Sequence, residues 1–212
     1  MSLLTLLEEA ATRGFPADGG AVEVLPAPSG ACDAVLTLMG KTVVAAGITE
    51  RWVAERVPRD DLSGPMRPDF VAALAEELGT SPGSIDVLLA APGYASRPIV
   101  EMSEIAHDEA GVGLADRFGS DVRSYADRES GGTISLGHGL DGRLDLLINL
   151  STDSRFIGRG WKIVEAARTF VPPEDFLFAS IPPGNAGCLR AALGAGFTPI
   201  GAEVLFSVRP AS

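Results

Sequence analysis

The chain has 212 residues and a mass of 22.0 kDa, and its composition, 46% hydrophobic and 21% charged, is typical of one large globular domain or two small ones. The net charge of −11 argues against a nucleic-acid partner, because phosphate backbones bind basic surfaces. No apolar run reaches the roughly 18–20 residues of a membrane span, and the first residues lack the pattern of a secretory signal, so we expect a cytoplasmic protein without a membrane partner. Cys32 and Cys188 lack the spacing of metal ligands, so no metal site is expected.

The first part of the chain, residues 1–98, predicts an α/β segment of unknown role. Helices are expected over residues 2–13, 52–57 and 69–78. Strands are expected over residues 21–25, 32–39, 42–46 and 85–90, with a tight turn at Gly40-Lys41. The third helix has the strongest pattern, because Phe70, Leu74 and Leu78 recur at helical spacing.

The remainder, residues 99–212, predicts a second region that could also be continuous with the first. Helices are expected over residues 99–117, 161–171 and 186–195. Strands are expected over residues 121–125, 133–136, 144–150, 176–181 and 200–208. The second and third of these strands should form an antiparallel pair, and a crossover helix follows them. The predicted fold class is therefore α/β (α+β), with a mixed, largely antiparallel sheet flanked by helices.

A glycine-containing turn, Arg155-x-x-Gly158-x-Gly160, lies where the strand 144–150 gives way to a helix. The first backbone N–H groups of a helix have no intrahelical acceptor, and the helix dipole adds partial positive charge, so such a turn suits an anion. The segment 155–168 carries four basic residues against one acidic residue, Glu165. This basic island favours a phosphorylated cofactor, although a solvated helix face with ordinary arginines would have the same composition.

Two common phosphate-binding motifs do not fit this turn. A dinucleotide fingerprint needs a third glycine where Ile163 stands, and a Walker loop needs Gly-Lys-Ser/Thr, which is absent. The remaining pattern resembles the cofactor-binding motif of the GNAT acetyltransferase superfamily, (Gln/Arg)-x-x-Gly-x-(Gly/Ala). Asn185, followed by a short helix and by Gly196-Phe197, resembles the closing segment of the same family, so the resemblance covers roughly residues 131–206, about a third of the chain.

The resemblance implies acetyl-CoA as the acyl donor. In the family, the strands on either side of the motif splay apart to admit it. By position, backbone groups of the first strand's end would bind the pantetheine arm, N–H groups of the turn would hold the pyrophosphate with two arginines nearby, and an asparagine would lie beside the cofactor. The implied cofactor-binding residues are Asn149, Leu150, Arg155, Phe156, Ile157, Gly158, Arg159, Gly160, Trp161 and Asn185.

The same resemblance implies an N-acetyltransferase that acts on a primary amine of a small molecule or peptide. Asp145 is near the position of the catalytic base in some members, and the alternative is a solvent-exposed acid at a strand end. Many members place a tyrosine, the acid for the leaving thiolate, where this chain has Ala192. A catalytically degenerate binding or interaction protein of the same fold is therefore the alternative function, and another acyl-CoA such as succinyl-CoA is an alternative donor. A sheet edge left uncovered would favour a homodimer.

Overall fold

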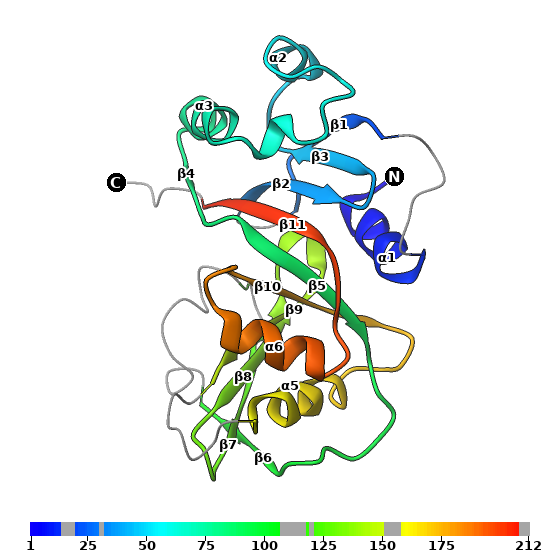
Figure 1. Ribbon diagram of the computed structural model, residues 1–212, viewed down its shortest axis with the longest axis vertical. Helices are drawn as coiled ribbons and strands as arrows, with labels where there is room; N and C mark the ends of the chain where they lie inside the picture. Colours follow the sequence, from blue (N-terminus) through cyan, green and yellow to red (C-terminus); the bar gives the residue numbers. More distant parts are fainter. Residues whose placement is uncertain (14–19, 30–31, 107–117, 119–120, 151–157, 208–212) are drawn as a thin grey trace. The chain divides into compact units, whose positions relative to one another are not determined.

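The computed structural model describes residues 1–13, 20–29, 32–106, 118, 121–150 and 158–207. The chain forms two compact units (Figure 1). Unit 1 comprises residues 1–87, 140–142 and 200–212, and unit 2 comprises residues 88–139 and 143–199. The predicted division at residue 98 stays a prediction about domains, because compactness alone does not show which parts fold independently. No described helix is long and apolar enough to cross a membrane.

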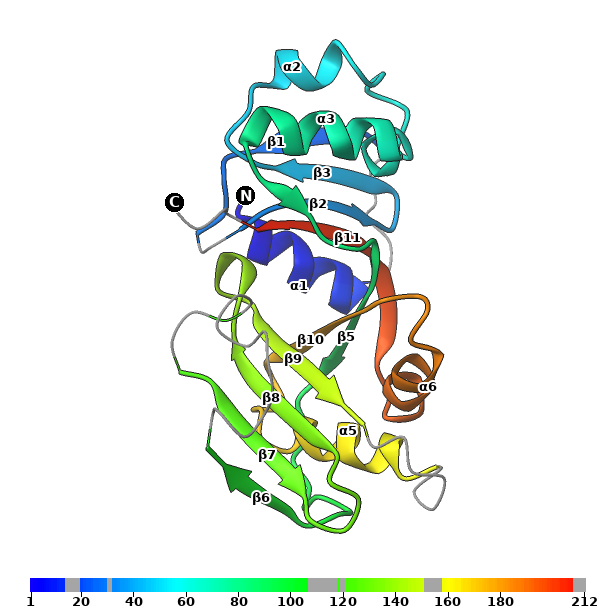
Figure 2. The same ribbon diagram turned by 90° about the vertical axis from the view of Figure 1, so that its left-hand side faces the viewer.

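Unit 1 is a small sheet with helices on both faces. Its strands are β1 (Val22–Leu25), β2 (Cys32–Leu38), β3 (Lys41–Ala45), β4 (Ser81–Pro82) and most of β11 (Thr198–Ser207), in the order β1-β3-β2-β11, with β4 also pairing with β11. Its helices are α1 (Leu3–Arg13), α2 (Glu50–Ala54) and α3 (Pro68–Leu78), with short 3₁₀ turns at Gly64–Met66 and Leu140–Gly142. α2 and α3 lie on one side of these strands and α1 lies on the other (Figure 2).

The apolar core of unit 1 lies between the sheet and α3. Phe70, Leu74 and Ala75 of α3 pack with Val44 of β3 and Phe206 of β11 in one buried cluster. Phe70 and Leu74 belong to the i, i+4, i+8 set that predicted this helix, and Leu78, its third member, is partly buried and packs against the same cluster. Gly79 then ends the helix in the left-handed conformation, with φ +65°.

Unit 2 carries six further strands and the helix pair that follows the glycine turn. Its strands are β5 (Asp86–Pro92, in unit 2 from Leu88), β6 (Met102–Ile105), β7 (Arg123–Asp127), β8 (Thr133–His138), β9 (Leu144–Asn149) and β10 (Phe176–Ile181), in the order β5-β10-β9-β8-β7-β6. Its helices are α5 (Gly160–Arg168) and α6 (Ala186–Gly194), which lie side by side (Figures 1 and 2). Ile163 and Val164 of α5 and Leu177 and Phe178 of β10 are buried.

Strand pairing confirms the predicted fold class. Neighbouring strands are antiparallel in β2–β3, β2–β11, β4–β11, β6–β7, β7–β8 and β8–β9, and parallel in β1–β3 and β9–β10. The hairpin predicted around Gly40 forms with Leu38 opposite Lys41. The predicted pair of strands leading into the glycine turn forms as β8–β9, with Thr133 opposite Asn149.

The helix predicted over residues 99–117 is wrong in its first part. Met102–Ile105 is strand β6, and it pairs antiparallel with β7 from Met102↔Asp127 to Ile105↔Ser124. Residues 107–117 lie outside the described part of the chain. Strand β7 provides the backbone hydrogen-bond partners of this short segment. Strand pairing depends on residues elsewhere in the chain, so the sequence pattern of one segment does not reveal it. The short helix predicted over residues 52–57 begins two residues earlier, because Thr49 caps it by accepting a hydrogen bond from the Trp52 N–H at 3.2 Å.

Candidate functional site

The described part of the glycine turn, Gly158–Trp161, leads directly into α5. Arg155, Phe156 and Ile157 lie outside the described residues. Gly158 has φ +85°, a conformation that strains any residue with a Cβ, although a Cβ there would touch nothing within 4 Å. Gly160 is required for a different reason, because a Cβ there would lie 2.7 Å from Leu150 Cδ1 and 3.4 Å from Ala191 Cβ. The two motif glycines thus provide a left-handed turn and a close approach of α5 to its neighbours.

The first amides of α5 are not capped by the protein within the described residues. The N-cap residue is Arg159, whose side chain makes no capping hydrogen bond and has no acceptor atom to offer. No acidic residue lies in the first turn of the helix. The earliest amides with a described acceptor are those of Lys162 and Ile163, which donate to the Arg159 carbonyl at 2.9 and 3.4 Å. Within the described residues, no acceptor is present for the N–H groups of Gly160 and Trp161, and their availability to an anion stays a prediction.

Arg159 does not offer a free positive charge at this turn. Its Nε and Nη2 donate to the two carboxylate oxygens of Asp127 at 2.6 and 3.0 Å, and Nη2 also lies 2.7 Å from Glu129 Oε2. The Asp127 side chain is only 2% exposed. The hydrogen bond from Arg159 is the largest cause that lowers the pKa of Asp127 to about 2. Arg159 stays a predicted cofactor residue, but in this arrangement its guanidinium fastens the start of α5 to the β7–β8 turn.

The β7–β8 turn is built to hold that carboxylate. Asp127 also accepts hydrogen bonds from the backbone N–H groups of Glu129 and Ser130, at 3.4 and 3.3 Å, and from Ser130 Oγ at 2.5 Å. Gly131, with φ +73°, closes the turn by donating to the Asp127 carbonyl at 2.8 Å. Sequence reasoning missed Asp127. The pattern Asp-x-x-Ser-Gly-Gly indicates a turn, but nothing in it indicates a partner 32 residues away.

Among the described basic residues of the segment 155–168, two differ from Arg159. Arg168 uses its guanidinium at the other end of α5, where it donates to the Pro92 and Ala195 carbonyls at 3.0 and 2.7 Å. Lys162 forms no ion pair within the described residues, and its Nζ lies 5.8 Å from the centre of the Trp161 ring, which is itself 36% exposed. Among the described basic residues of the predicted basic island, Lys162 is therefore the one that offers an unpaired positive charge near the glycine turn.

The parallel pair β9–β10 is joined at its beginning only. Asp145 is opposite Phe178, and this is the one register pair between the two described strands. On its other edge β9 pairs with β8 along its whole length, from Leu144↔His138 to Asn149↔Thr133. The edge of β9 that faces β10 thus lacks strand pairing toward Asn149, which is exposed, and Leu150, which is half-buried. Strand pairing between β9 and β10 thus ends before the glycine turn, and the entry of a cofactor there stays a prediction.

Asp145, the predicted base, lies in a buried ion pair. Its side chain is 1% exposed and that of Arg143 is 0% exposed, with Arg143 Nε 2.7 Å from Asp145 Oδ1. Arg143 Nη2 also donates to Ser180 Oγ at 3.4 Å. The alternative interpretation of Asp145, a solvent-exposed acid at a strand end, is therefore wrong. Its role as a base stays a prediction, and the ion pair with Arg143 also gives it a structural role.

Asn185 caps α6. Its Oδ1 accepts a hydrogen bond from the Cys188 N–H at 3.1 Å, and its backbone N–H donates to the Pro182 carbonyl at 2.8 Å. Burial raises the pKa of the Cys188 thiol, while hydrogen bonds with the Asn185 side chain and the Leu150 backbone oppose that rise. Cys188, interpreted from sequence as a core thiol, is buried but lies beside two predicted cofactor residues. The sequence did not show that α6 lies against the end of β9, which is what brings Cys188 next to these residues.

At the position on α6 where the resemblance implies a tyrosine, this chain has Ala192. Ala192 is 0% exposed and its carbonyl accepts from the Phe197 N–H at 3.0 Å, so this position belongs to the packing of the helix end. Of the two tyrosines, Tyr125 is 8% exposed and stacks on Phe170 with ring centres 4.2 Å apart, and Tyr94 is exposed with Arg168 5.3 Å from its ring centre. Neither tyrosine replaces the missing residue at the position of Ala192.

Comparison with known proteins gives structural likenesses only. No protein-family model matches the sequence, and no curated protein matches it. A GCN5-related N-acetyltransferase from Kribbella flavida is 18% identical, with a TM-score of 0.43 over 66% of this chain and 64% of that one. A GNAT-family acetyltransferase from Colwellia psychrerythraea (13% identity, TM-score 0.37, 67% and 63%) and a GCN5-related N-acetyltransferase from Sphaerobacter thermophilus (15%, 0.37, 68% and 58%) are also similar.

The chain spans less than two thirds of the length of these three structures. At this level of identity and TM-score, the likeness carries no conclusion about a reaction or a substrate. The family named in these structures is the one that the glycine motif of this sequence resembles.

Proposed function

We propose that the protein is an N-acyltransferase that transfers an acetyl group from acetyl-CoA to a primary amine. The observation that carries the proposal is the glycine turn at the head of α5, where the N-cap residue Arg159 offers no side-chain acceptor and the first turn holds no acidic residue. A diphosphate brings negative charge and several acceptor oxygens, which the first N–H groups of the helix and its dipole would stabilise. Lys162 adds a positive charge in the same helical turn, without an ion pair to a described residue.

The unpaired edge of β9 supports the same proposal. An extended pantetheine arm carries amide groups that can hydrogen-bond a strand edge, as an additional strand would. Asn149 and Leu150 lie at the end of this edge, directly before the turn in the sequence. A ligand that combines a diphosphate with an extended amide-containing arm would therefore meet the turn and the strand edge together. Acetyl-CoA is such a ligand, and when bound it supplies the activated acyl group.

The proposed reaction forms a nitrogen–carbon bond and breaks the carbon–sulfur bond of the thioester. The attacking amine must lose a proton, the developing oxyanion needs an N–H donor, and the leaving thiolate must gain a proton. Backbone N–H groups on the unpaired edge of β9 are the proposed oxyanion donors. Asp145 is the proposed base, with Arg143 holding its carboxylate in one orientation.

A second candidate function, a binding protein of the same fold without transferase activity, is favoured by one observation. Ala192 is buried where the family places a tyrosine, so the described part of α6 supplies no acid for the thiolate at that position. Release of free thiol from acetyl-CoA, measured across a panel of amines, separates the two candidates. Turnover on any amine well above the rate without enzyme would reject the binding-only function.

Ligand-induced stabilisation tests the main proposal. We expect acetyl-CoA at saturation to raise the melting temperature of the protein, because it binds only the native state. Gly158→Glu should abolish this rise, because it places a negative charge and a side chain at the proposed diphosphate position.

The matched control is Gly79→Glu. Gly79 has φ +65° and, like Gly158, nothing within 4 Å of an added Cβ, but it lies at the end of α3 in unit 1. Both variants therefore carry the same added charge and the same kind of backbone strain, about 1–2 kcal/mol. Gly79→Glu should keep the rise with acetyl-CoA. No rise in the wild-type protein, or equal rises in the two variants, would reject the proposal.

A further inference from the structure

The guanidinium of Arg159 has two edges that can each bind a pair of acceptor oxygens, and the protein fills only one of them. On the first edge, Nε and Nη2 donate to the two carboxylate oxygens of Asp127 at 2.6 and 3.0 Å. The second edge consists of Nη1 and Nη2. Glu129 Oε2 lies 2.7 Å from Nη2, whereas Nη1 donates no hydrogen bond to a described residue. One carboxylate oxygen therefore contacts the second edge without filling it.

The two carboxylates that share Arg159 are held very differently. Asp127 is 2% exposed, and its side chain also accepts hydrogen bonds from the N–H groups of Glu129 and Ser130 and from Ser130 Oγ. The Glu129 side chain is 65% exposed. Removing the buried partner of a charge is costly, whereas an exposed ion pair contributes little and exchanges readily with water or with another ion. Glu129 is thus the replaceable partner of Arg159, and Asp127 is the permanent one.

The turn that carries Glu129 lies against both parts of the proposed cofactor site. A Cβ at Gly132, in the same β7–β8 turn, would lie 2.8 Å from Ile163 Cδ1 of α5 and 3.6 Å from the Asn149 carbonyl oxygen of β9. Arg159 itself is the N-cap residue of α5. The second edge of its guanidinium, with Glu129 beside it, therefore belongs to the same corner of unit 2 as the glycine turn.

An anion that binds the second edge of Arg159 must take the place of Glu129. A phosphate binds such an edge with two oxygens, one on each terminal nitrogen. The oxygen bound to Nη2 would need the position that Glu129 Oε2 holds at 2.7 Å. The Glu129 carboxylate also repels an incoming anion, and its release into water costs little because it is already largely exposed. Anion binding at this edge is therefore a competition between Glu129 and the ligand.

We propose that Glu129 makes this site selective for a diphosphate. The inference rests on the proposed acetyl-CoA function and assigns a specificity-determining residue to that same site. A diphosphate carries more charge and more oxygens than a single phosphate or a chloride ion, so it gains more from Arg159 and from the head of α5 when it displaces Glu129. A weaker anion gains too little and is excluded. Proteins commonly build specificity from such a repulsive group as well as from attractive contacts.

Removal of the competing charge tests the proposal. Glu129→Gln leaves a neutral amide of similar size, and we expect acetyl-CoA to bind this variant about fivefold more tightly than the wild-type protein in isothermal titration calorimetry. Inorganic phosphate should compete with acetyl-CoA in the variant at concentrations that leave wild-type binding unchanged, because the selective group is gone. Since Glu129 is exposed, the variant should remain folded, and circular dichroism checks this.

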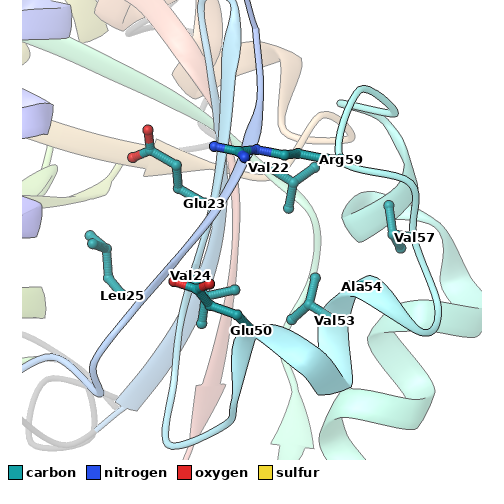
Figure 3. A pocket seen from close by; sticks show the side chains of 9 residues that line it. All are labelled: Val22, Glu23, Val24, Leu25, Glu50, Val53, Ala54, Val57 and Arg59. Carbon is teal, nitrogen blue, oxygen red and sulfur yellow. The ribbon is translucent and has the colours of Figure 1, made fainter.

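Two exposed acids control for the loss of one negative charge. Glu174 lies in unit 2, in the turn before β10, and Glu50 lies in unit 1, where it lines a groove between β1 and α2 (Figure 3). The described ion pairs of Arg159 include neither of them. Glu174→Gln and Glu50→Gln should therefore leave the affinity for acetyl-CoA unchanged. A gain equal to that of Glu129→Gln would assign the effect to net charge and overturn the proposal.

A double variant separates competition for Arg159 from simple repulsion of the ligand. Arg159→Lys keeps a positive charge for Asp127 but has no second edge, because an ammonium group is a single charged point. If Glu129 competes for that edge, adding Glu129→Gln to Arg159→Lys should improve the affinity for acetyl-CoA by less than about twofold. Simple repulsion would give the full gain in this background as well, and that result would overturn the proposal.

The results separate this proposal from the function on which it rests. If the wild-type protein binds acetyl-CoA and Glu129→Gln binds it no more tightly, the selectivity role of Glu129 is wrong while the acetyl-CoA site stands. If neither protein binds acetyl-CoA, both proposals are overturned. If Glu129→Gln binds acetyl-CoA measurably and the wild-type protein does so more weakly or below detection, both are supported.

Discussion

The two helices of unit 2 begin in opposite ways. At the head of α6, Asn185 provides a side-chain acceptor for the Cys188 N–H at 3.1 Å, so the protein satisfies this end by itself. At the head of α5, the N-cap residue is Arg159, which provides no acceptor, and no acidic residue follows in the first turn. The same unit therefore caps one helix with a side chain and, among the described residues, gives the other no side-chain cap.

The difference extends to what holds each helix end in place. α6 is held by its own cap, whereas α5 is held through the guanidinium of Arg159, which is paired with Asp127 on the β7–β8 turn. An arginine at the N-cap positions the helix without occupying its amides. Positioning a helix and capping it are therefore separate tasks, and among the described residues α5 has the first without a side-chain cap.

The largest effect is expected from removing the carboxylate that holds α5. Asp127→Ala should lower the free energy of unfolding by about 3 kcal/mol, because it leaves Arg159 without its buried partner. Glu129→Gln is the control, since Glu129 contacts the same guanidinium but is 65% exposed, and it should cost less than about 1 kcal/mol. Urea unfolding measures both. Equal losses in the two variants would contradict the role given to Asp127.

Acid should weaken the same attachment. Asp127 has a pKa of about 2 in the folded protein, below its ordinary value of 3.8, because Arg159 stabilises the charged form. A lowered folded-state pKa contributes stability that is present above about pH 4 and is lost as the pH falls toward about 2. The loss should amount to about 2 kcal/mol.

The measurement compares wild type with Asp127→Asn, which cannot titrate at this position. The difference in unfolding free energy between the two proteins should shrink as the pH falls from about 5 to about 2.5. A difference that stays constant over this range would show that the Asp127 carboxylate does not supply the acid-sensitive stability.

A smaller effect is expected at the other helix. Asn185→Ala removes the cap of α6 and should cost about 1 kcal/mol of unfolding free energy. Asn149→Ala replaces an exposed asparagine at the end of β9 and should change stability by less than about 0.5 kcal/mol. If Asn185→Ala lowered the free energy of unfolding no more than Asn149→Ala does, the Asn185 cap would not stabilise α6.

Local sequence features predicted much of the fold. Gly40-Lys41 indicated the β2–β3 hairpin, and the spacing of Phe70, Leu74 and Leu78 indicated α3, because turns and amphipathic helices are determined by residues close in the chain. The position of the glycine turn before α5 followed from the change of hydrophobic period at Trp161. The start of α6 at Asn185 was predicted because an asparagine side chain can accept a hydrogen bond from the first amides of a helix.

Features that depend on distant parts of the chain were not predicted. The strand Met102–Ile105 is defined by its pairing with β7, and the Asp127–Arg159 ion pair joins residues 32 positions apart. The sequence showed that Arg159 lies in a basic island, but it did not show that two carboxylates already share its charge. Asp145 was placed correctly on a strand, while its burial with Arg143 depends on packing that a strand pattern does not specify.

The most direct measurement is a titration of the isotopically labelled protein with acetyl-CoA, followed through its backbone amide resonances. If the open head of α5 binds the diphosphate, the amides of Gly160 and Trp161 should show the largest saturable shifts. The amide of Cys188, already bonded to Asn185, should move much less. Saturable binding that leaves Gly160 and Trp161 unmoved, or no binding at all, would contradict the proposal that the head of α5 binds the anionic ligand.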